Sequence, residues 1–486
     1  MRRALAPWAI PLGLALLFGT LPGPVAPALA APPEEGECPA ISATPSGAEP
    51  ATDATPLVIK EGMRISAEGL LALQSLLPAA IWRHRERFFF EGMSLEIGPC
   101  QRRYPVPAFY SEATRKFSGQ VSLDKQGNLE NYVAGVPFPP DSIDPQSEVA
   151  AAKWAWNLEK RFRGAGYAGR FRITDFPNRM GSIMRYRGDF FAFQAAGRAD
   201  QADNDYRSPG TGSLLWATGG KFVAPFGARE LAWRQLRTIA SEQAWNRPDD
   251  IFVYVPSLRK SRRSGTPWVD GAFMPRYSVA DQSQGGGGLA LGGGSINPGA
   301  GPSLAVTENA RAGLTGLYLR PNAYRWRLRG EQAVIAPINT IRPGWPSVEG
   351  RNYGASGLSV ASDRWDVRHA VVIEGLLRQS SETIRSLTIY IDYQTLQPLY
   401  WITRTGKRRL VEVGILVHRF AGDRSDKPRW PGDSPSLVFE PVAASFVNAL
   451  AGRGGWLRES HELKSVPFDA SAIKRMTSTS SLNRGH

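Results

Sequence analysis

Hydrophobic and polar positions alternate through most of the chain from about residue 170 onward, and this pattern predicts strands. The apolar segments are short and lie between clusters of Gly, Pro, Asn and Asp, which is typical of strands joined by turns. No long helical patterns alternate with them, so parallel βαβ units are disfavoured. The expected strands are 171–173, 183–186, 190–193, 251–255, 371–377, 387–391, 399–403 and 411–417.

Three segments instead show the apolar spacing of helices. Leucines from Leu70 to Leu77 follow Ser66, a potential N-cap, and Pro78 ends this pattern. Further helices are expected over 149–162 and 228–244. The pattern therefore predicts a β-rich α+β chain built on a large antiparallel sheet with one apolar and one wet face.

The predicted hairpin 387–403 and the strand after it indicate which side chains share a face. One side of this sheet is apolar over three successive strands, and the helices 70–77 and 228–244 are too few to cover about ten strands. We therefore expect uncovered apolar surface that faces inward and lines a cavity. The expected lining consists of Ile389, Ile391, Trp401, Val413, Ile415, Phe252 and Tyr254.

Composition narrows the class of protein. An apolar fraction of 42% in 486 residues excludes global disorder, and 50 Gly with 38 Pro fit a chain rich in turns. Five His and two Cys exclude zinc-finger arrays, iron–sulfur proteins and disulfide-dense scaffolds. The net charge of +14 indicates an acidic partner.

The N-terminus reads as a secretory signal peptide over 1–30. Arg2 and Arg3 precede an apolar run from Ala9 to Leu21, and an A-x-A site ends at Ala30. The composition is rich in Arg, Ala and Gly, which is typical of a high-GC Gram-negative bacterium. Together with export, it predicts a soluble periplasmic protein with no transmembrane span in the mature chain. It also removes nucleic acid as the expected partner.

The rest of the chain divides by composition. A flexible leader is expected over 31–56, one large domain over 57–475 and a disordered tail over 476–486. The segment 284–302 is rich in Gly and reads as a mobile surface loop. Two cysteines in an oxidising compartment usually pair, so Cys38 and Cys100 are predicted to form a disulfide.

Four blocks of sequence resemble the exported bacterial family called "domain of unknown function 1329", which is grouped with the LolA/LolB-like lipoprotein carriers. The resemblance implies a curved, half-closed antiparallel sheet with helices on its concave face and a cavity for acyl chains. It also implies a resistance-nodulation-division transporter and an outer-membrane barrel protein as partners, and it brings no catalytic motif. The blocks are 132–139 (YVAGVPFP) with 153–157 (KWAWN), 250–256 (DIFVYVP) with Arg259 and Lys260, Trp365 with 371–375 (VVIEG), and 389–392 (IYID) with 397–399 (QPL).

Catalytic and metal-binding patterns are weak. No G-x-S-x-G nucleophile elbow is present, and no C-x-x-C or H-E-x-x-H metal motif occurs, so we expect neither a metal nor another cofactor. A hydrolase would have to draw on looser candidates. These are Ser356 or Ser359 with His369 or His418 and Asp363 or Asp366, and the carboxylate pairs Asp249 with Asp250 and Asp363 with Asp366.

Two exposed basic clusters are expected as a rim that meets anionic headgroups or an acidic partner. Together these features favour a periplasmic carrier for a lipid or other hydrophobic cargo over an exported hydrolase of envelope lipids or polymers. A structural adaptor of an envelope complex with a filled core is the third reading. The basic rim consists of Arg259, Lys260, Arg262, Arg263, Lys407, Arg408 and Arg409.

Overall fold

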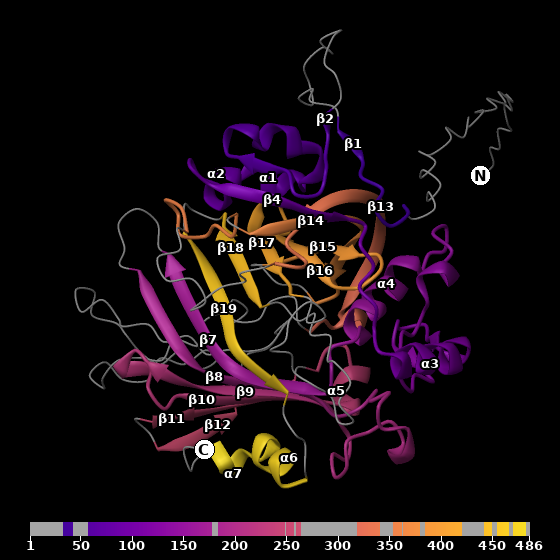
Figure 1. Ribbon diagram of the computed structural model, residues 1–486. Coiled ribbons are helices and arrows are strands. Elements are labelled where there is room, and N and C mark those ends of the chain that lie inside the picture. The colour runs from indigo at the N-terminus through magenta and orange to yellow at the C-terminus, as the bar shows by residue number, and fades with distance from the viewer. Residues whose placement is uncertain are drawn as a thin grey trace, which may run out of the picture.

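The computed structural model is dominated by one sheet of fifteen strands (Figure 1). It describes residues 33–41, 57–176, 183–247, 249–256, 259–263, 318–340, 353–361, 363–379, 384–419, 442–449, 454–465 and 470–482. The predicted signal peptide 1–30 and the Gly-rich loop 284–302 lie outside the described residues.

The strands of the large sheet follow one another mostly in antiparallel pairs. They are β3 (Arg64–Ser66), β4 (Ser94–Cys100), β7 (Gly166–Phe176), β8 (Met184–Gln194), β9 (Leu214–Ala224), β10 (Ala232–Thr238), β11 (Asp250–Val255), β12 (Lys260–Arg263), β13 (Tyr324–Ala336), β14 (Arg364–Leu377), β15 (Ser386–Asp392), β16 (Pro398–Arg404), β17 (Leu410–Val417), β18 (Ala443–Asn448) and β19 (Gly455–Ser465). The order is β12-β11-β10-β9-β8-β7-β19-β18-β17-β16-β15-β14-β4-β3, with β13 also paired to β14 and only β4 and β14 parallel.

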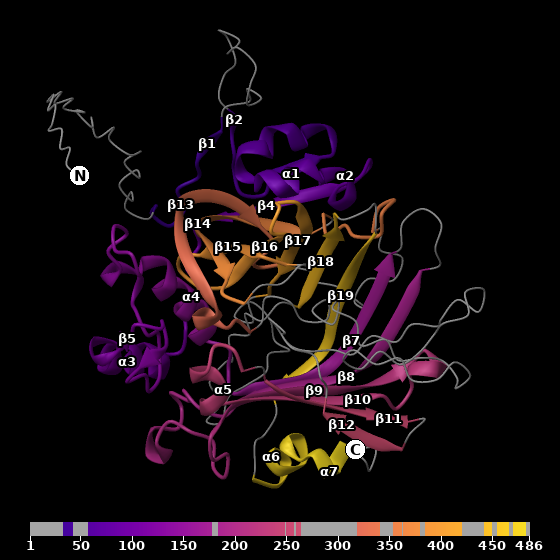
Figure 2. The ribbon, with the colours of Figure 1, turned by 180° about the vertical axis from the view of Figure 1, so that it is seen from behind.

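The sheet is strongly curved and open. Strands β7 to β12 form one half and β13 to β18 the other, and the two halves face each other across a concave side (Figures 1 and 2). The long strand β19 joins them by pairing with β18 on one side and β7 on the other. This confirms the predicted β-rich class with a large curved antiparallel sheet.

The helices are few and short. They are η1 (Glu68–Leu76), α1 (Ala79–Arg83), α2 (Arg85–Phe88), α3 (Ala108–Phe117), η2 (Ser118–Gln120), η3 (Pro140–Ser142), α4 (Ala150–Lys160), η4 (Ala202–Asn204), η5 (Phe226–Ala228), α5 (Ile239–Gln243), η8 (Pro321–Ala323), α6 (Ala470–Thr477) and α7 (Thr479–Leu482). Two-stranded ribbons add β1 (Ala40–Ile41) with β2 (Leu57–Val58), and β5 (Ser122–Leu123) with β6 (Leu129–Glu130). Among the described residues, no helix is both long and apolar enough to cross a bilayer.

The helices divide between the two faces of the sheet. Helix α4 lies on the concave side between the two halves, whereas α1 and α2 lie outside the upper half and α6 and α7 outside the lower half (Figures 1 and 2). The leucine segment expected on the concave face forms η1, and its Leu73 packs in the same cluster as Val413 on the outer face. That placement corrects the expected position of this helix.

The prediction of a helix over 228–244 is wrong for most of that segment. Residues 232–238 form β10, which is hydrogen-bonded to β9 on one side and β11 on the other, and only Ile239–Gln243, near the end of the segment, are α-helical. Arg, Leu, Gln and Ala favour helices intrinsically, but two flanking strands satisfy the backbone of this segment and bury Trp233.

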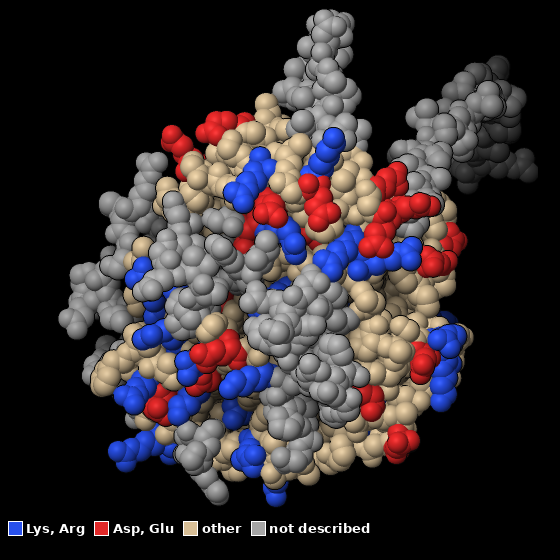
Figure 3. Space-filling model, in the orientation of Figure 1, with Lys and Arg blue, Asp and Glu red and all other residues tan. Residues whose placement is uncertain are grey.

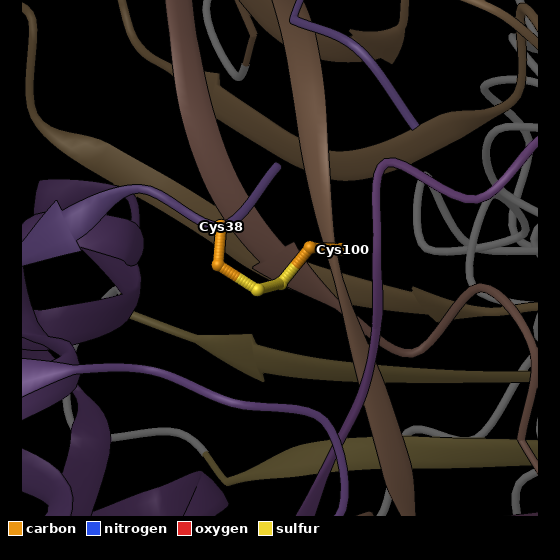
Figure 4. The surroundings of a disulfide bond; sticks show 2 residues. All are labelled: Cys38 and Cys100. Atoms are coloured by element: carbon orange, nitrogen blue, oxygen red, sulfur yellow. A yellow bond between two sulfur atoms is a disulfide. The ribbon is translucent and has the colours of Figure 1, made fainter. Parts of the chain in front are cut away.

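The described parts of the leader and of the tail have defined contacts, which composition did not indicate. Cys38 and Cys100 form the predicted disulfide, which joins the leader to β4 (Figure 4). Gly36 N also donates to Cys100 O at 2.9 Å, so residues 33–41 of the expected flexible leader are fixed. The tail expected to be disordered from 476 is helical through α7, where Leu482 is buried.

Candidate functional site

The concave face of the lower half carries a continuous aromatic surface. Phe171, Phe190, Phe222 and Trp233 come from four adjacent strands, and their ring centroids lie 5.4–6.4 Å apart in successive contacts. No described α-helix contributes to this cluster, which is completed by residues of the same strands and of β11, by Ala228 of η5 and by Leu231 before β10. We call it the aromatic concave cluster: Tyr167, Phe171, Ile173, Tyr186, Phe190, Phe222, Trp233, Ile251, Val253 and Val255.

Glycines beneath the rings shape this surface. A Cβ at Gly188 would lie 2.6 Å from the ring of Phe171, and one at Gly220 would lie 2.5 Å from the ring of Trp233. Both distances are shorter than side-chain packing allows, so only glycine lets the rings lie along the neighbouring strand. These glycines therefore let the rings pack closely on the concave side, where the rings are buried.

Three predicted lining residues lie on the concave face of the upper half. Ile389 is paired with Trp401 across β15 and β16, and both are buried with Ile391 in a cluster that includes Trp154 of α4. Helix α4 thus covers this part of the concave face, which the sequence pattern expected to be uncovered and to line a cavity.

The other predicted lining residues do not share that face. In the register of β16 with β17, Trp401 lies opposite Gly414, so Val413 and Ile415 point to the outer face, in the cluster that contains Leu73 of η1 and Ile81 of α1. Phe252 and Tyr254 are half-buried on β11, where their neighbours Ile251 and Val253 enter the aromatic concave cluster. These four residues therefore cannot line one cavity together with Trp401.

The two basic clusters are exposed and separate. Arg259, Lys260, Arg262 and Arg263 surround β12, the edge strand of the sheet, whereas Lys407, Arg408 and Arg409 form the turn between β16 and β17. Arg263 pairs with Asp250. On the face shown in Figure 3, Lys and Arg are interspersed with Asp and Glu, so no uniform basic surface forms there.

A buried ionic network fixes α4 to the lower half of the sheet. Arg237 of β10 donates to Glu159 Oε1 at 3.1 Å and to Asp249 Oδ1 at 3.0 Å. Arg320 donates to Asp249 Oδ1 at 2.7 Å, and Leu319 N donates to Glu159 Oε2 at 2.6 Å. Sequence reasoning missed this network because its members are far apart along the chain.

The network sets the charge state of Asp249. Burial alone would raise the pKa of Asp249, but Arg237 and Arg320 hold that pKa at about 2. Asp249 is thus an ionised structural anchor, and its sequence neighbour Asp250 faces Arg263 at the sheet edge instead. The two do not form a carboxylate pair for glycoside hydrolysis, which requires one carboxyl group in its protonated form.

Three of the candidate hydrolase side chains have polar partners within the fold. Ser359 Oγ accepts from Ala361 N at 3.1 Å, His418 Nε2 lies 2.7 Å from the carbonyl oxygen of Pro398, and His369 Nε2 lies 2.5 Å from Glu331 Oε2. No serine–histidine hydrogen bond joins them within the described ranges. In the part of the chain that the structure describes, no three His, Cys, Asp or Glu side chains are arranged to hold a metal ion.

Asp366 is the exception among these carboxyls, because its charge is poorly compensated. Its side chain is fully buried on β14, Tyr104 OH donates to its Oδ2, and its Oδ1 has no hydrogen-bond partner in the described part of the chain. Burial raises the pKa of Asp366 to about 6 against the opposing effects of the Tyr104 hydrogen bond and of Arg368, Arg364 and Arg102.

We expect Asp366 to lower the free energy of unfolding as the pH rises. The pKa of Asp366 is about 6 in the folded protein and 3.8 ordinarily, so the folded state binds the proton more tightly. The contribution of this proton to the free energy of unfolding is therefore fully present below pH 3.8 and is lost as the pH rises through about 6. Asp366→Asn should therefore be more stable than wild type above pH 6, by on the order of 1–3 kcal/mol. Urea unfolding between pH 4 and pH 7 measures this, with exposed Asp203→Asn as the control. Parallel pH profiles for wild type and Asp366→Asn would contradict it.

The fold and this surface define a chain built around an open, curved sheet with an apolar concave side. A family model described as "Protein of unknown function (DUF1329)" matches residues 65–288, which confirms the resemblance carried by the sequence blocks. Two of the four blocks, 132–157 and 250–260, fall inside the matched segment. No curated protein matches the sequence significantly.

Solved structures similar to this chain come from several bacteria. A DUF1329 family protein from Desulfovibrio piger is 14% identical, covering 70% of this chain and 99% of that chain with a TM-score of 0.39. A putative outer membrane lipoprotein-sorting protein domain from Vibrio parahaemolyticus is 10% identical over 70% and 100%, with a TM-score of 0.39. A LolA superfamily protein from Nitrosomonas europaea is 12% identical over 68% and 98%, with a TM-score of 0.33.

Proposed function

We propose that this protein is a periplasmic carrier that binds a lipid or another hydrophobic molecule on the concave face of its sheet. The aromatic concave cluster carries this proposal, because sites for small apolar ligands are concave, preformed and lined mainly by hydrophobic and aromatic side chains. The buried ionic network supports it by anchoring α4 at one end of the concave side and so keeping the two halves of the sheet in place.

The carrier would act with an envelope export system, for which a resistance-nodulation-division transporter and an outer-membrane barrel protein are the proposed partners. The exposed basic clusters on β12 and on the β16–β17 turn supply positive charge for contact with anionic headgroups or an acidic partner surface. No catalytic role is proposed, since the candidate Ser and His side chains already serve the fold.

We expect Phe190→Ala to reduce cargo retention several-fold. Phe190 lies in the aromatic concave cluster, whereas Phe193 on the same strand lies on the opposite face in a cluster with Ile473 of α6. Both phenylalanines are buried, so each substitution should cost about 3–5 kcal/mol of unfolding free energy. Phe193→Ala is therefore a matched control for the loss of stability.

The measurement is organic extraction and mass spectrometry of protein exported to the periplasm. Wild type and Phe193→Ala should carry the same hydrophobic molecule, and folded Phe190→Ala should carry much less of it. Equal retention by the two variants, or an empty wild-type protein under every growth condition, would favour a structural adaptor over a carrier.

A further inference from the structure

Cross-strand pairing brings cations together on the outer face of the upper half of the sheet. Arg325 of β13 is paired with Leu376 of β14, which is paired with Ser386 of β15. Ser386 is paired in turn with Arg404 of β16. Residues that lie directly opposite each other share a face of the sheet. Arg325 and Arg404 therefore point to the same side, about 14 Å apart across three strand spacings.

The adjacent row and the following turn add further cations. Arg327 is paired with Glu374 of β14, and Arg329 forms an ion pair with Glu374 on the same face. The turn 405–409, which follows Arg404, carries three exposed basic side chains. We call the whole set the outer basic face: Arg325, Arg327, Arg329, Arg404, Lys407, Arg408 and Arg409.

The positive charge of this face is only partly neutralised. Along the described strand residues, Glu374 is the one acid at this end of the outer face, and no other described carboxylate forms an ion pair with the set. The neighbouring Arg378 responds to this charge. Burial and then the charge of Arg325 lower the pKa of Arg378, and the opposing effect of Asp124 is smaller. The outer basic face is thus a site of positive potential.

The outer basic face points away from the cargo side of the sheet. Trp326 and Leu328 alternate with its arginines along β13 and pack in the concave cluster that contains Trp401. Figures 1 and 2 show α4 on that concave side of β13 to β16. A partner bound to the outer basic face therefore makes no contact with the concave side.

The chemistry of this face favours a layer of lipid headgroups over a folded protein. Protein interfaces are usually anchored by aromatic or other large apolar side chains. Among the described residues, no exposed large apolar side chain lies on β13 to β16 or on the turn 405–409. Arginine suits phosphate groups because its planar guanidinium donates two parallel hydrogen bonds. Attraction to an anionic bilayer needs only clustered positive charge close to the lipid surface.

We propose that the outer basic face docks the protein on a bilayer surface that contains anionic phospholipids, with the concave side directed away from the lipid. The arginines bind phosphate groups of the headgroups and do not enter the hydrocarbon. The use of this docking rests on the proposed carrier function: it holds a cargo-binding chain beside the membrane while the concave side stays accessible to a partner protein.

The test mixes protein purified after export with vesicles of phosphatidylcholine, with or without phosphatidylglycerol, and separates bound from free protein by flotation. Wild type should bind only the vesicles that contain phosphatidylglycerol, and high salt should release it because salt screens exposed charges. The triple variant Arg325→Gln/Arg327→Gln/Lys407→Gln should bind these vesicles about 100-fold more weakly at low salt, since each basic side chain near an anionic bilayer contributes about fivefold.

A matched control removes the same charges from the edge strand of the lower half. Arg259→Gln/Lys260→Gln/Arg262→Gln also replaces two arginines and one lysine, all exposed, and should keep wild-type binding. Urea unfolding should give wild-type midpoints for both triple variants, because the six side chains are on the surface.

The remaining outcomes overturn the proposal. They are no binding of wild type to anionic vesicles, equal binding with and without phosphatidylglycerol, and equal losses in the two triple variants. Tighter binding of wild type to immobilised polyglutamate than to anionic vesicles would assign this face to an acidic protein instead.

Cargo retention, measured on the same samples, separates docking from the carrier function. Loss of vesicle binding with unchanged cargo in the Arg325/Arg327/Lys407 variant supports docking on the outer face. An empty wild type that binds anionic vesicles refutes the carrier and leaves docking in place. A loaded wild type that does not bind them refutes docking and leaves the carrier in place.

Discussion

Replacing Arg237 by methionine is expected to destabilise the protein by about 3–5 kcal/mol, because the change removes the cation that two buried carboxylates share and leaves Asp249 with Arg320 and Glu159 with Arg163. Arg237 is 1% exposed and bridges Glu159 of α4 to Asp249 before β11. Its guanidinium also lies 4.7 Å from the ring centroid of Trp216, which stacks on Tyr318 at 4.0 Å. One substitution thus releases the contacts that hold α4, β10 and the 318–320 segment together.

Urea unfolding of wild type and Arg237→Met measures this loss. Arg170→Met is the matched control, because Arg170 pairs with Glu462 at the surface and exposed pairs contribute about 0–1 kcal/mol. Equal unfolding midpoints for Arg237→Met and Arg170→Met would show that the network does not anchor α4.

The class of fold was predictable from the sequence because strand patterns are local. Alternation of side chains along one strand depends only on the pleat, so the strands 251–255, 387–391, 399–403 and 411–417 appear in the structure as β11, β15, β16 and β17. The pairing of Cys38 with Cys100 was equally accessible, because only two cysteines exist.

The register between strands was not predictable in the same way. Each strand of the 387–417 region has an apolar face, but whether Val413 shares a face with Trp401 depends on the turn that connects β16 to β17. A shift of one residue in pairing exchanges the two faces of a strand. Both faces of this sheet are buried, one by η1 and one by α4, so polarity alone gave no signal of orientation.

The functional surfaces were predictable only in part. The aromatic content of the strands indicated an apolar concave side, but most of the predicted lining lies in the upper half, where α4 covers it. The two predicted lining residues on β11, Phe252 and Tyr254, alternate with Ile251 and Val253, which are the residues that enter the aromatic concave cluster. The ionic network joins residues as far apart as Glu159 and Arg237, and no local motif marks such a pair.

Removing the disulfide should cost about 4 kcal/mol of unfolding free energy, because it closes a loop between positions 62 residues apart. Cys100 ends β4, which pairs with β3 on one side and β14 on the other, so the bond ties the leader to the large sheet. The leader adds its own contacts there: Gly36 N donates to Cys100 O at 2.9 Å, and Arg103 N donates to Glu35 Oε1 at 3.1 Å.

The double variant Cys38→Ser/Cys100→Ser, compared with oxidised and reduced wild type by urea unfolding, tests this effect. Reduced wild type and the double variant should unfold at the same, lower midpoint, and reductant should not change the double variant further. Hydrogen exchange adds a local readout, because the Gly36 amide should lose its protection when its covalent neighbour is released. If that amide loses protection while the global midpoint stays at the oxidised wild-type value, the bond holds only the leader and β4 is secured by its pairing with β3 and β14.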